Sequence, residues 1–88
     1  MLLRGYEEKA KNVLNKIKKN KGKAPSGYVG GRIFKNHEGK LPKNTKYREY
    51  DINPYVKGKN RGKERLVIGE NGSAWYTNNH YESFVRIE

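Results

Sequence analysis

Two acidic side chains stand close together in a strongly basic sequence. Glu49 and Asp51 occur in the stretch YREYD, residues 47–51. An ionised carboxylate can accept a proton or pair with a cation, and a strand places residues i and i+2 on the same face. Buried or half-buried carboxylates need such partners. The lysine- and arginine-rich segment 54–64 lies just downstream, so we expect a cluster of paired charges at this point.

The overall charge indicates a polyanionic partner. The 88 residues include 20 Lys and Arg against 9 Asp and Glu, with a formal net charge of +11. Nucleic acid, an anionic membrane or an acidic protein would suit this charge. The length suits one domain, residues 1–88, with a small core. There is no cysteine, which excludes disulfides and thiol chemistry. No apolar run approaches the roughly 20 residues of a spanning helix, and the initial Met-Leu-Leu is too short for a signal-peptide core.

One helix is predicted near the beginning of the chain. Apolar residues recur at helical spacing over about residues 6–20, and Gly22 follows as a left-handed cap. The apolar stripe consists of Tyr6, Ala10, Val13, Leu14 and Ile17. Such a stripe is typical of a helix that packs on a sheet, although a basic amphipathic helix also permits a role at a membrane surface.

The rest of the chain, about residues 28–88, predicts a sheet. Strands are expected at 46–53, 65–69, 74–77 and 82–87, with Asn71-Gly72 as a hairpin turn. A short strand or loop with a close backbone approach is expected at 28–34, around Gly30 and Gly31. The aromatic residues Tyr47, Tyr50, Trp75, Tyr76 and Phe84 are expected in the core or on the sheet. A helix followed by hairpin-linked strands predicts an α+β fold, with the helix packed on a twisted antiparallel sheet of about four or five strands.

Four stretches in order carry a family resemblance. They are IFKNHEGKLP (33–42), YREYDIN (47–53), NRGKER (60–65) and NNHYESF (78–84). Together they resemble the barnase-like family of microbial guanyl-specific ribonucleases, most of all its short streptomycete-type members. The resemblance implies the microbial ribonuclease fold. It also implies a cofactor-free and metal-free enzyme that cleaves single-stranded RNA after guanosine, through a 2′,3′-cyclic phosphate.

The resemblance also implies roles for individual residues. Glu49 matches the general base, His80 the general acid, and Arg61 and Arg65 the phosphate-binding arginines. The matching substrate-binding residues are Phe34, Lys35, Asn36, His37, Glu38 and Tyr81. Within that group Glu38 is the carboxylate expected to accept both adjacent N–H donors of guanine. From strand geometry we expect Asp51 to orient and partly neutralise one or both arginines.

Some features depart from the family pattern or allow another interpretation. His37 stands where the guanine loop usually carries an arginine, and the disulfide of many streptomycete-type members is absent. Each acidic or basic residue could also be an ordinary surface charge. A metal site built on His37 and His80 is not expected, because no metal-binding motif surrounds them. The alternative function is a non-catalytic RNA- or DNA-binding module on the same fold.

The resemblance further implies a partner and a location. An active ribonuclease would damage the cell that makes it, so secretion, delivery to rivals as an antibacterial toxin, or binding by a small acidic barstar-like inhibitor is expected. Complementary charge would speed association with such an inhibitor. We expect a monomer that does not bind membranes.

Overall fold

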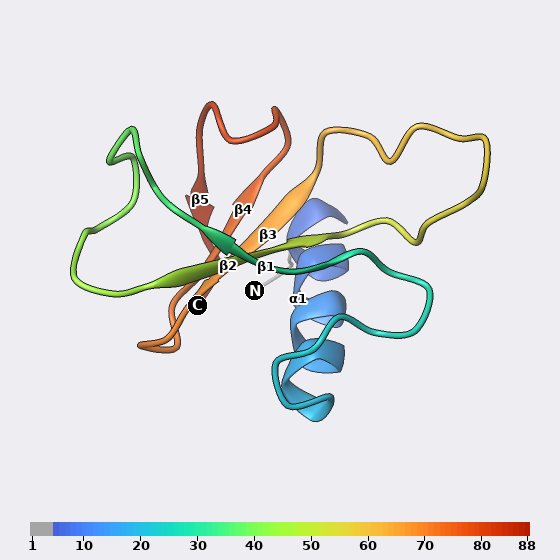
Figure 1. Ribbon diagram of the computed structural model, residues 1–88, viewed down its shortest axis with the longest axis horizontal. Helices are drawn as coiled ribbons and strands as arrows, with labels where there is room; N and C mark the ends of the chain where they lie inside the picture. Colours follow the sequence, from blue (N-terminus) through green and yellow to red (C-terminus); the bar gives the residue numbers. More distant parts are fainter. Residues whose placement is uncertain (1–4) are drawn as a thin grey trace.

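The protein is one helix against a single antiparallel sheet, as predicted. The computed structural model describes residues 5–88, with side chains from Glu8 onward. The elements are α1 (Gly5–Lys19), β1 (Gly30–Phe34), β2 (Tyr47–Asp51), β3 (Arg65–Gly69), β4 (Ala74–Thr77) and β5 (Val85–Arg86). The strands are ordered β1-β2-β3-β4-β5, so each pairs with its neighbour in the chain. In Figure 1, α1 stands beside this sheet, and the loop after β2 projects away from the loop after β1.

Helix α1 follows the predicted apolar stripe. Ala10, Val13, Leu14 and Ile17 are buried, whereas the side chain of Tyr6 lies outside the described residues. Lys16, Lys18 and Lys19 occupy the last turn, where cations interact favourably with the helix dipole. The chain then reverses at Gly22, which has a φ of +87° and donates its N–H to the Ile17 carbonyl at 2.9 Å. The helix therefore ends with the expected left-handed glycine.

The sheet is buried on both faces, and the alternation in β2 determines which face each side chain joins. Tyr50 packs toward α1 with Leu66 and Tyr76. Tyr47 points to the opposite face, where it packs with Val67 and Leu41 in a second, smaller cluster. Glu49 and Asp51 alternate with Tyr50, so they belong to this second face. The carboxylates thus lie beside a small apolar core.

Cross-strand register places polar side chains in rows on the second face. Asp51 pairs with Arg65 on β3, and Arg65 pairs with Thr77 on β4. In the next row, Arg32 on β1 pairs with Glu49. Directly opposed residues of antiparallel strands share a face. The sheet therefore sets the relative positions of most of the candidate site.

The first strand shows the predicted close backbone approach. Gly30 lies so near Tyr50 that an added Cβ would stand 2.7 Å from the Tyr50 Cα, and Gly31 has a φ of +96°. The pairing with β2 shifts between Gly30 and Arg32. Glycine tolerates this bulge because it has no side chain and accepts positive φ.

The last strand is much shorter than predicted. A strand was expected over 82–87, but β5 contains only Val85–Arg86. The backbone N–H of Ser83 donates to Asn79 Oδ1 at 3.0 Å, and Asn79 Nδ2 donates to Ser83 Oγ at 2.8 Å. These bonds hold residues 79–83 as a turn, so Ser83 has no N–H free for the sheet.

The basic loop after β2 is anchored where it returns to the sheet. Glu64 accepts hydrogen bonds from Lys9 Nζ at 2.9 Å, Asn53 Nδ2 at 3.3 Å and the Tyr76 hydroxyl at 2.5 Å. Partial burial acts to raise the pKa of Glu64, but the bonds from Tyr76, Lys9 and Asn53 outweigh it and leave the pKa lowered. The ionised Glu64 therefore ties the end of the loop to α1 and β4.

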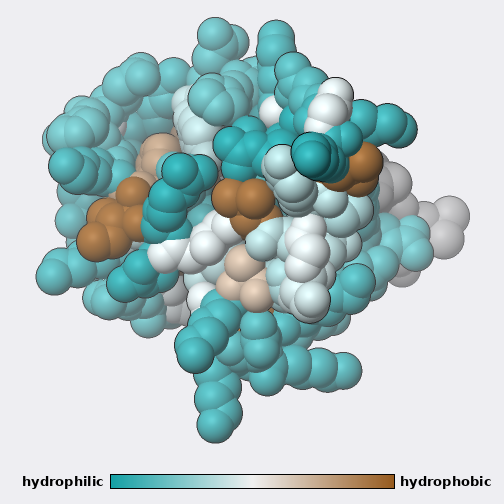
Figure 2. Space-filling view, turned by 45° about the vertical axis from the view of Figure 1, so that its right-hand side comes forward, coloured by the Kyte–Doolittle hydropathy of each residue, from teal (hydrophilic) through white to brown (hydrophobic). Residues whose placement is uncertain are grey.

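The surface is dominated by hydrophilic side chains. In Figure 2 the hydrophobic groups form small separate areas within a largely hydrophilic face. The large apolar side chains exposed among the described residues are Ile33, Tyr55, Val56 and Val85. Isolated apolar groups of this kind are ordinary on a folded protein.

Candidate active site

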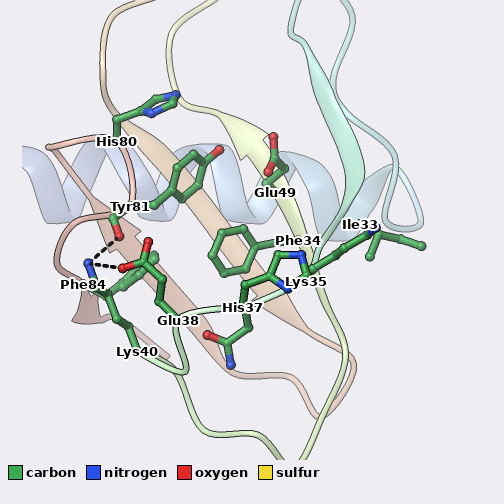
Figure 3. Close-up of a pocket in the computed structure, with 11 residues that line it drawn as sticks. Ile33, Phe34, Lys35, His37, Glu38, Lys40, Glu49, His80, Tyr81 and Phe84 are labelled. Carbon is green, nitrogen blue, oxygen red and sulfur yellow. Dashed lines mark hydrogen bonds and ion pairs between the residues drawn. The ribbon is translucent and has the colours of Figure 1, made fainter.

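A pocket of about 380 Å³ gathers most of the predicted site residues. It is lined by Ile33, Phe34, Lys35, Asn36, His37, Glu38, Lys40, Glu49, His80, Tyr81 and Phe84. They come from the end of β1 and the loop after it, from the middle of β2, and from the turn before β5 (Figure 3). Three segments that are distant in the sequence thus form one concave surface.

The turn that carries His80 and Tyr81 has an unusual backbone. Their φ angles are +55° and +74°, in a region that costs energy for residues other than glycine. Hydrogen bonds hold it: the His80 N–H donates to the Lys63 carbonyl at 3.1 Å, and the Tyr81 N–H donates to Thr77 Oγ1 at 3.1 Å. The basic loop and β4 together therefore determine where the imidazole stands.

The Tyr81 hydroxyl is a buried donor at the pocket. It points toward Glu49 in Figure 3 and interacts with that carboxylate, but it makes no hydrogen bond of ordinary geometry among the described residues. Burial raises the pKa of Tyr81, and the negative charge of Glu49 raises it further, while Arg65 acts in the opposite direction. The phenol therefore stays protonated at neutral pH. A buried donor without an ordinary hydrogen bond marks a position where a ligand atom can bind.

Aromatic rings form part of the pocket wall. The rings of Phe34 and Tyr81 stack with centroids 5.1 Å apart, and Phe84 meets Phe34 edge-on at 6.0 Å. Phe84, predicted only to pack, both packs in the second cluster and lines the pocket. The stacked pair presents apolar surface of the kind on which a nucleobase packs.

The loop after β1 is closed by its own hydrogen bonds. Asn36 has a φ of +53°; its side-chain amide donates to the Leu41 carbonyl at 2.9 Å and accepts from the Leu41 N–H at 3.1 Å. Gly39 turns the chain with a φ of +66°. Because the Asn36 side chain is used inside the loop, its predicted contact with a ligand would come from its backbone.

Lys40 is a pocket residue that the sequence did not reveal. Its Nζ donates to the Glu82 carbonyl at 2.7 Å and to the Tyr81 carbonyl at 3.5 Å, and it lies 3.3 Å from Glu38 Oε2. It thus joins the loop after β1 to the turn before β5. The Glu38 side chain remains 76% exposed, so its carboxylate is accessible. A single lysine among 20 Lys and Arg carries no sequence signal.

Asp51 pairs with both predicted arginines beside the pocket. It is 3% exposed, with Oδ1 3.0 Å from Arg65 Nε and Oδ2 3.1 Å from Arg61 Nη1. Arg65, itself 6% exposed, also donates through Nη1 to the carbonyls of Gly62 and Glu64. The predicted pairing is present, and its part in catalysis stays a prediction. Neither arginine is among the residues that line the pocket.

Glu49 has a cationic neighbour that was also not predicted. Arg32 Nη2 lies 3.8 Å from Glu49 Oε1, with the carboxylate side chain 23% exposed. The pairing depends on the register between β1 and β2, which the sequence pattern did not specify. Among the described residues, no group of three or more His, Cys, Asp or Glu side chains could hold a metal ion.

Comparison with known proteins finds similarity to bacterial ribonucleases. Guanyl-specific ribonuclease St of Saccharopolyspora erythraea is 43% identical over 56 residues, or 61% of this chain and 54% of that protein. A ribonuclease of Heyndrickxia coagulans is 42% identical over 66 residues, or 73% of this chain and 59% of that protein. The chain thus matches little more than half the length of these curated relatives.

The fold and a family model extend the match to nearly the whole chain. The structure of ribonuclease Sa2 with guanosine-2′-cyclophosphate superposes with a TM-score of 0.68 and 31% identity, over 92% of this chain and 85% of that chain. A family model described as ribonuclease matches residues 3–88. This chain therefore belongs to the ribonuclease family, and the helix and antiparallel sheet of its described residues have the fold of a solved ribonuclease.

Proposed function

We propose that this protein is a guanyl-preferring endoribonuclease that cleaves single-stranded RNA on the 3′ side of guanosine. The observation that carries the proposal is the pocket, which unites Glu49, His80 and the loop 34–38 on one concave surface. A relative named as a guanyl-specific ribonuclease and a similar fold solved with a guanosine cyclophosphate support it. The net charge of +11 adds attraction to the RNA backbone.

The first chemical step is an attack within the substrate. Glu49 accepts the proton of the guanosine 2′-hydroxyl, and the 2′-oxygen forms a bond to phosphorus as the bond to the 5′-oxygen of the next nucleotide breaks. His80 in its protonated form gives that leaving oxygen a proton. The products are a 2′,3′-cyclic phosphate and an RNA with a free 5′-hydroxyl. In the slower second step water opens the ring, with the two proton transfers reversed.

Cationic and neutral donors stabilise the charge on the phosphoryl oxygens. Arg65 and Arg61 are held in place by Asp51, and guanidinium groups bind such oxygens with directed hydrogen bonds. The Tyr81 hydroxyl, buried and without an ordinary hydrogen bond among the described residues, supplies a further donor. Because burial and the nearby Glu49 raise the pKa of Tyr81, it donates without becoming an anion.

RNAs of defined sequence test the proposal directly. The protein is incubated, in excess chelator, with four short single-stranded RNAs that each contain one G, A, C or U at the test position. We expect cleavage only after G and a 2′,3′-cyclic phosphate on the 5′ product. Binding of all four RNAs without cleavage would overturn the proposal and support a basic nucleic-acid-binding module instead.

Replacing Glu38 tests how guanine is recognised. In Glu38→Ala we expect kcat/KM after G to fall about 10- to 100-fold, toward the value after A, because a charge-assisted pair of hydrogen bonds to the base is lost. Initial rates on the G- and A-containing RNAs give the ratio. Glu70→Ala, the same charge change at an exposed hairpin position, is the control and should leave the ratio unchanged. An unaltered ratio in Glu38→Ala would remove Glu38 from guanine recognition.

We also propose where such an enzyme acts. It is secreted, or delivered to rival cells as an antibacterial toxin, and it is bound by a small acidic inhibitor whenever it shares a compartment with its host's RNA. The charge of +11 suits rapid association with an acidic protein. Within residues 5–88, the helix is neither long nor apolar enough to cross a membrane. Co-purification of an acidic protein that blocks cleavage at equimolar concentration would support this partner.

A further inference from the structure

Arg32 is a cation beside the predicted base that has no assigned role. It lies on β1 directly opposite Glu49 on β2, with 3.8 Å between Arg32 Nη2 and Glu49 Oε1. That separation allows an ion pair but exceeds the length of a hydrogen bond. The Arg32 side chain is 65% exposed, and its hydrogen-bond donors have no partner elsewhere among the described residues. A guanidinium has five donors, so Arg32 can bind another anion while it remains near Glu49.

The charges around Glu49 indicate what Arg32 could do. Arg61 and Arg65 bring two positive charges, while Asp51 and Glu49 bring two negative charges close to them. The charges of these four groups cancel, although the site must bind a phosphate that carries a negative charge. Lys35, Lys40 and the proposed protonated His80 add positive charge from the loop and turn that line the pocket, and Arg32 adds it on the sheet itself, next to Glu49. It also stands on the β1 side of Glu49, whereas Arg65 lies on the β3 side.

We propose that Arg32 is a further substrate-binding residue, whose guanidinium binds a non-bridging oxygen of the reacting phosphate from the β1 side of Glu49. The inference rests on the proposed ribonuclease function. If Glu49 takes the 2′-proton, the reacting phosphorus lies next to the oxygen that Glu49 faces. A cation 3.8 Å from that carboxylate is then within reach of the phosphoryl oxygens. Arg32 thus binds the phosphate from the side opposite Arg61 and Arg65, the two arginines that Asp51 holds.

Binding of two small ligands isolates the phosphate contact. Calorimetry measures the Kd of guanosine and of guanosine 3′-monophosphate, and the ratio of the two gives the contribution of the phosphate. In Arg32→Ala we expect this ratio to fall about 10-fold, with the Kd of guanosine unchanged, since one charge-assisted contact to the phosphate is lost. Arg32→Lys should restore part of the ratio, because it keeps the charge but not the fork of donors.

The matched control is another arginine of the same strand pair. Arg48 is exposed, adjacent to Glu49 in sequence and hence on the other face of the sheet. Its Nη1 also donates to the Gly31 carbonyl at 2.6 Å, so Arg48→Ala removes the same charge together with one contact to β1. It should still leave the ratio within about twofold of wild type. If Arg32→Ala and Arg48→Ala give the same ratio of the two Kd values, Arg32 does not bind the phosphate and the inference is overturned. That result is also expected if Arg32 only holds Glu49 in place.

Cleavage of a dinucleotide separates this inference from the proposed function. Guanylyl-3′,5′-uridine contains only the reacting phosphate, and kcat/KM for it should fall about 10-fold in Arg32→Ala but not in Arg48→Ala. A loss seen only with longer RNA would overturn the assignment to the reacting phosphate. If wild-type protein cleaves no RNA, the proposed function itself fails. If wild type cleaves and Arg32→Ala matches it on both substrates, only the inference fails.

Discussion

Replacing either residue of the proposed proton-transfer pair is expected to abolish most of the activity. Glu49→Ala and His80→Ala should each lower kcat on a guanosine-containing RNA by roughly 10²- to 10⁴-fold, the usual contribution of a positioned acid or base. Without Glu49 the 2′-hydroxyl keeps its proton, and without His80 the 5′-oxygen must leave as an alkoxide. Single-turnover cleavage of a labelled RNA, with product analysis, measures both losses.

Two controls separate chemistry from folding and binding. Both variants should bind guanosine with nearly the wild-type Kd, because neither side chain is assigned to the base. Glu49→Gln, which keeps the shape of the side chain but cannot accept the proton, should be about as inactive as Glu49→Ala. Variants that retain more than about a tenth of wild-type kcat would contradict the assigned roles.

The second large effect is on folding stability, at Asp51. Asp51→Ala should lower the free energy of unfolding by about 3–5 kcal/mol, the typical result of removing one partner of a buried ion pair. Arg65 is 6% exposed and would keep a buried positive charge without its carboxylate. Urea unfolding followed by tryptophan fluorescence gives the difference, and Trp75 is the one tryptophan of the chain.

An exposed ion pair supplies the comparison for Asp51. Glu88 pairs with Lys18 at the surface, and Glu88→Ala should change the free energy of unfolding by less than about 1 kcal/mol. If Asp51→Ala is no more destabilising than Glu88→Ala, then Asp51 does not hold the two arginines in the folded protein. Any Asp51→Ala protein that folds should also bind guanosine 3′-monophosphate more weakly, because Arg61 and Arg65 lose their common anchor.

The fold could be predicted from local patterns because those patterns are strong. The apolar stripe ending at Ile17 and the glycine at position 22 specify an amphipathic helix and its end. Asn71-Gly72 specifies a tight hairpin, and Gly72 indeed adopts a φ of +88°. Alternation around Tyr50 identified the two faces of β2. Each of these signals depends on residues close in sequence.

The parts that escaped prediction depend on contacts between distant residues. Arg32 meets Glu49 only through the register of β1 against β2, and Lys40 reaches the Glu82 carbonyl across 42 positions of sequence. Strand β5 was predicted too long because the pattern of apolar residues does not reveal the hydrogen bonds between Asn79 and Ser83. Side-chain hydrogen bonds within turns compete with strand pairing, and the residue pattern alone does not show which of the two arrangements is more stable.

The aromatic contact between Phe34 and Phe84 has a consequence for when the proposed active site is complete. Phe34 is the last residue of β1, and Phe84 directly precedes β5. These two strands are the opposite edges of the sheet and do not pair with each other, so the two walls of the pocket meet through side chains. During synthesis, the wall formed by residues 34–38 is made early, but it has no opposite wall until residues 80–84 have left the ribosome and folded. We therefore expect a nascent chain whose residues 80–84 are not yet folded to lack the complete pocket, and hence not to cleave the messenger RNA that encodes it.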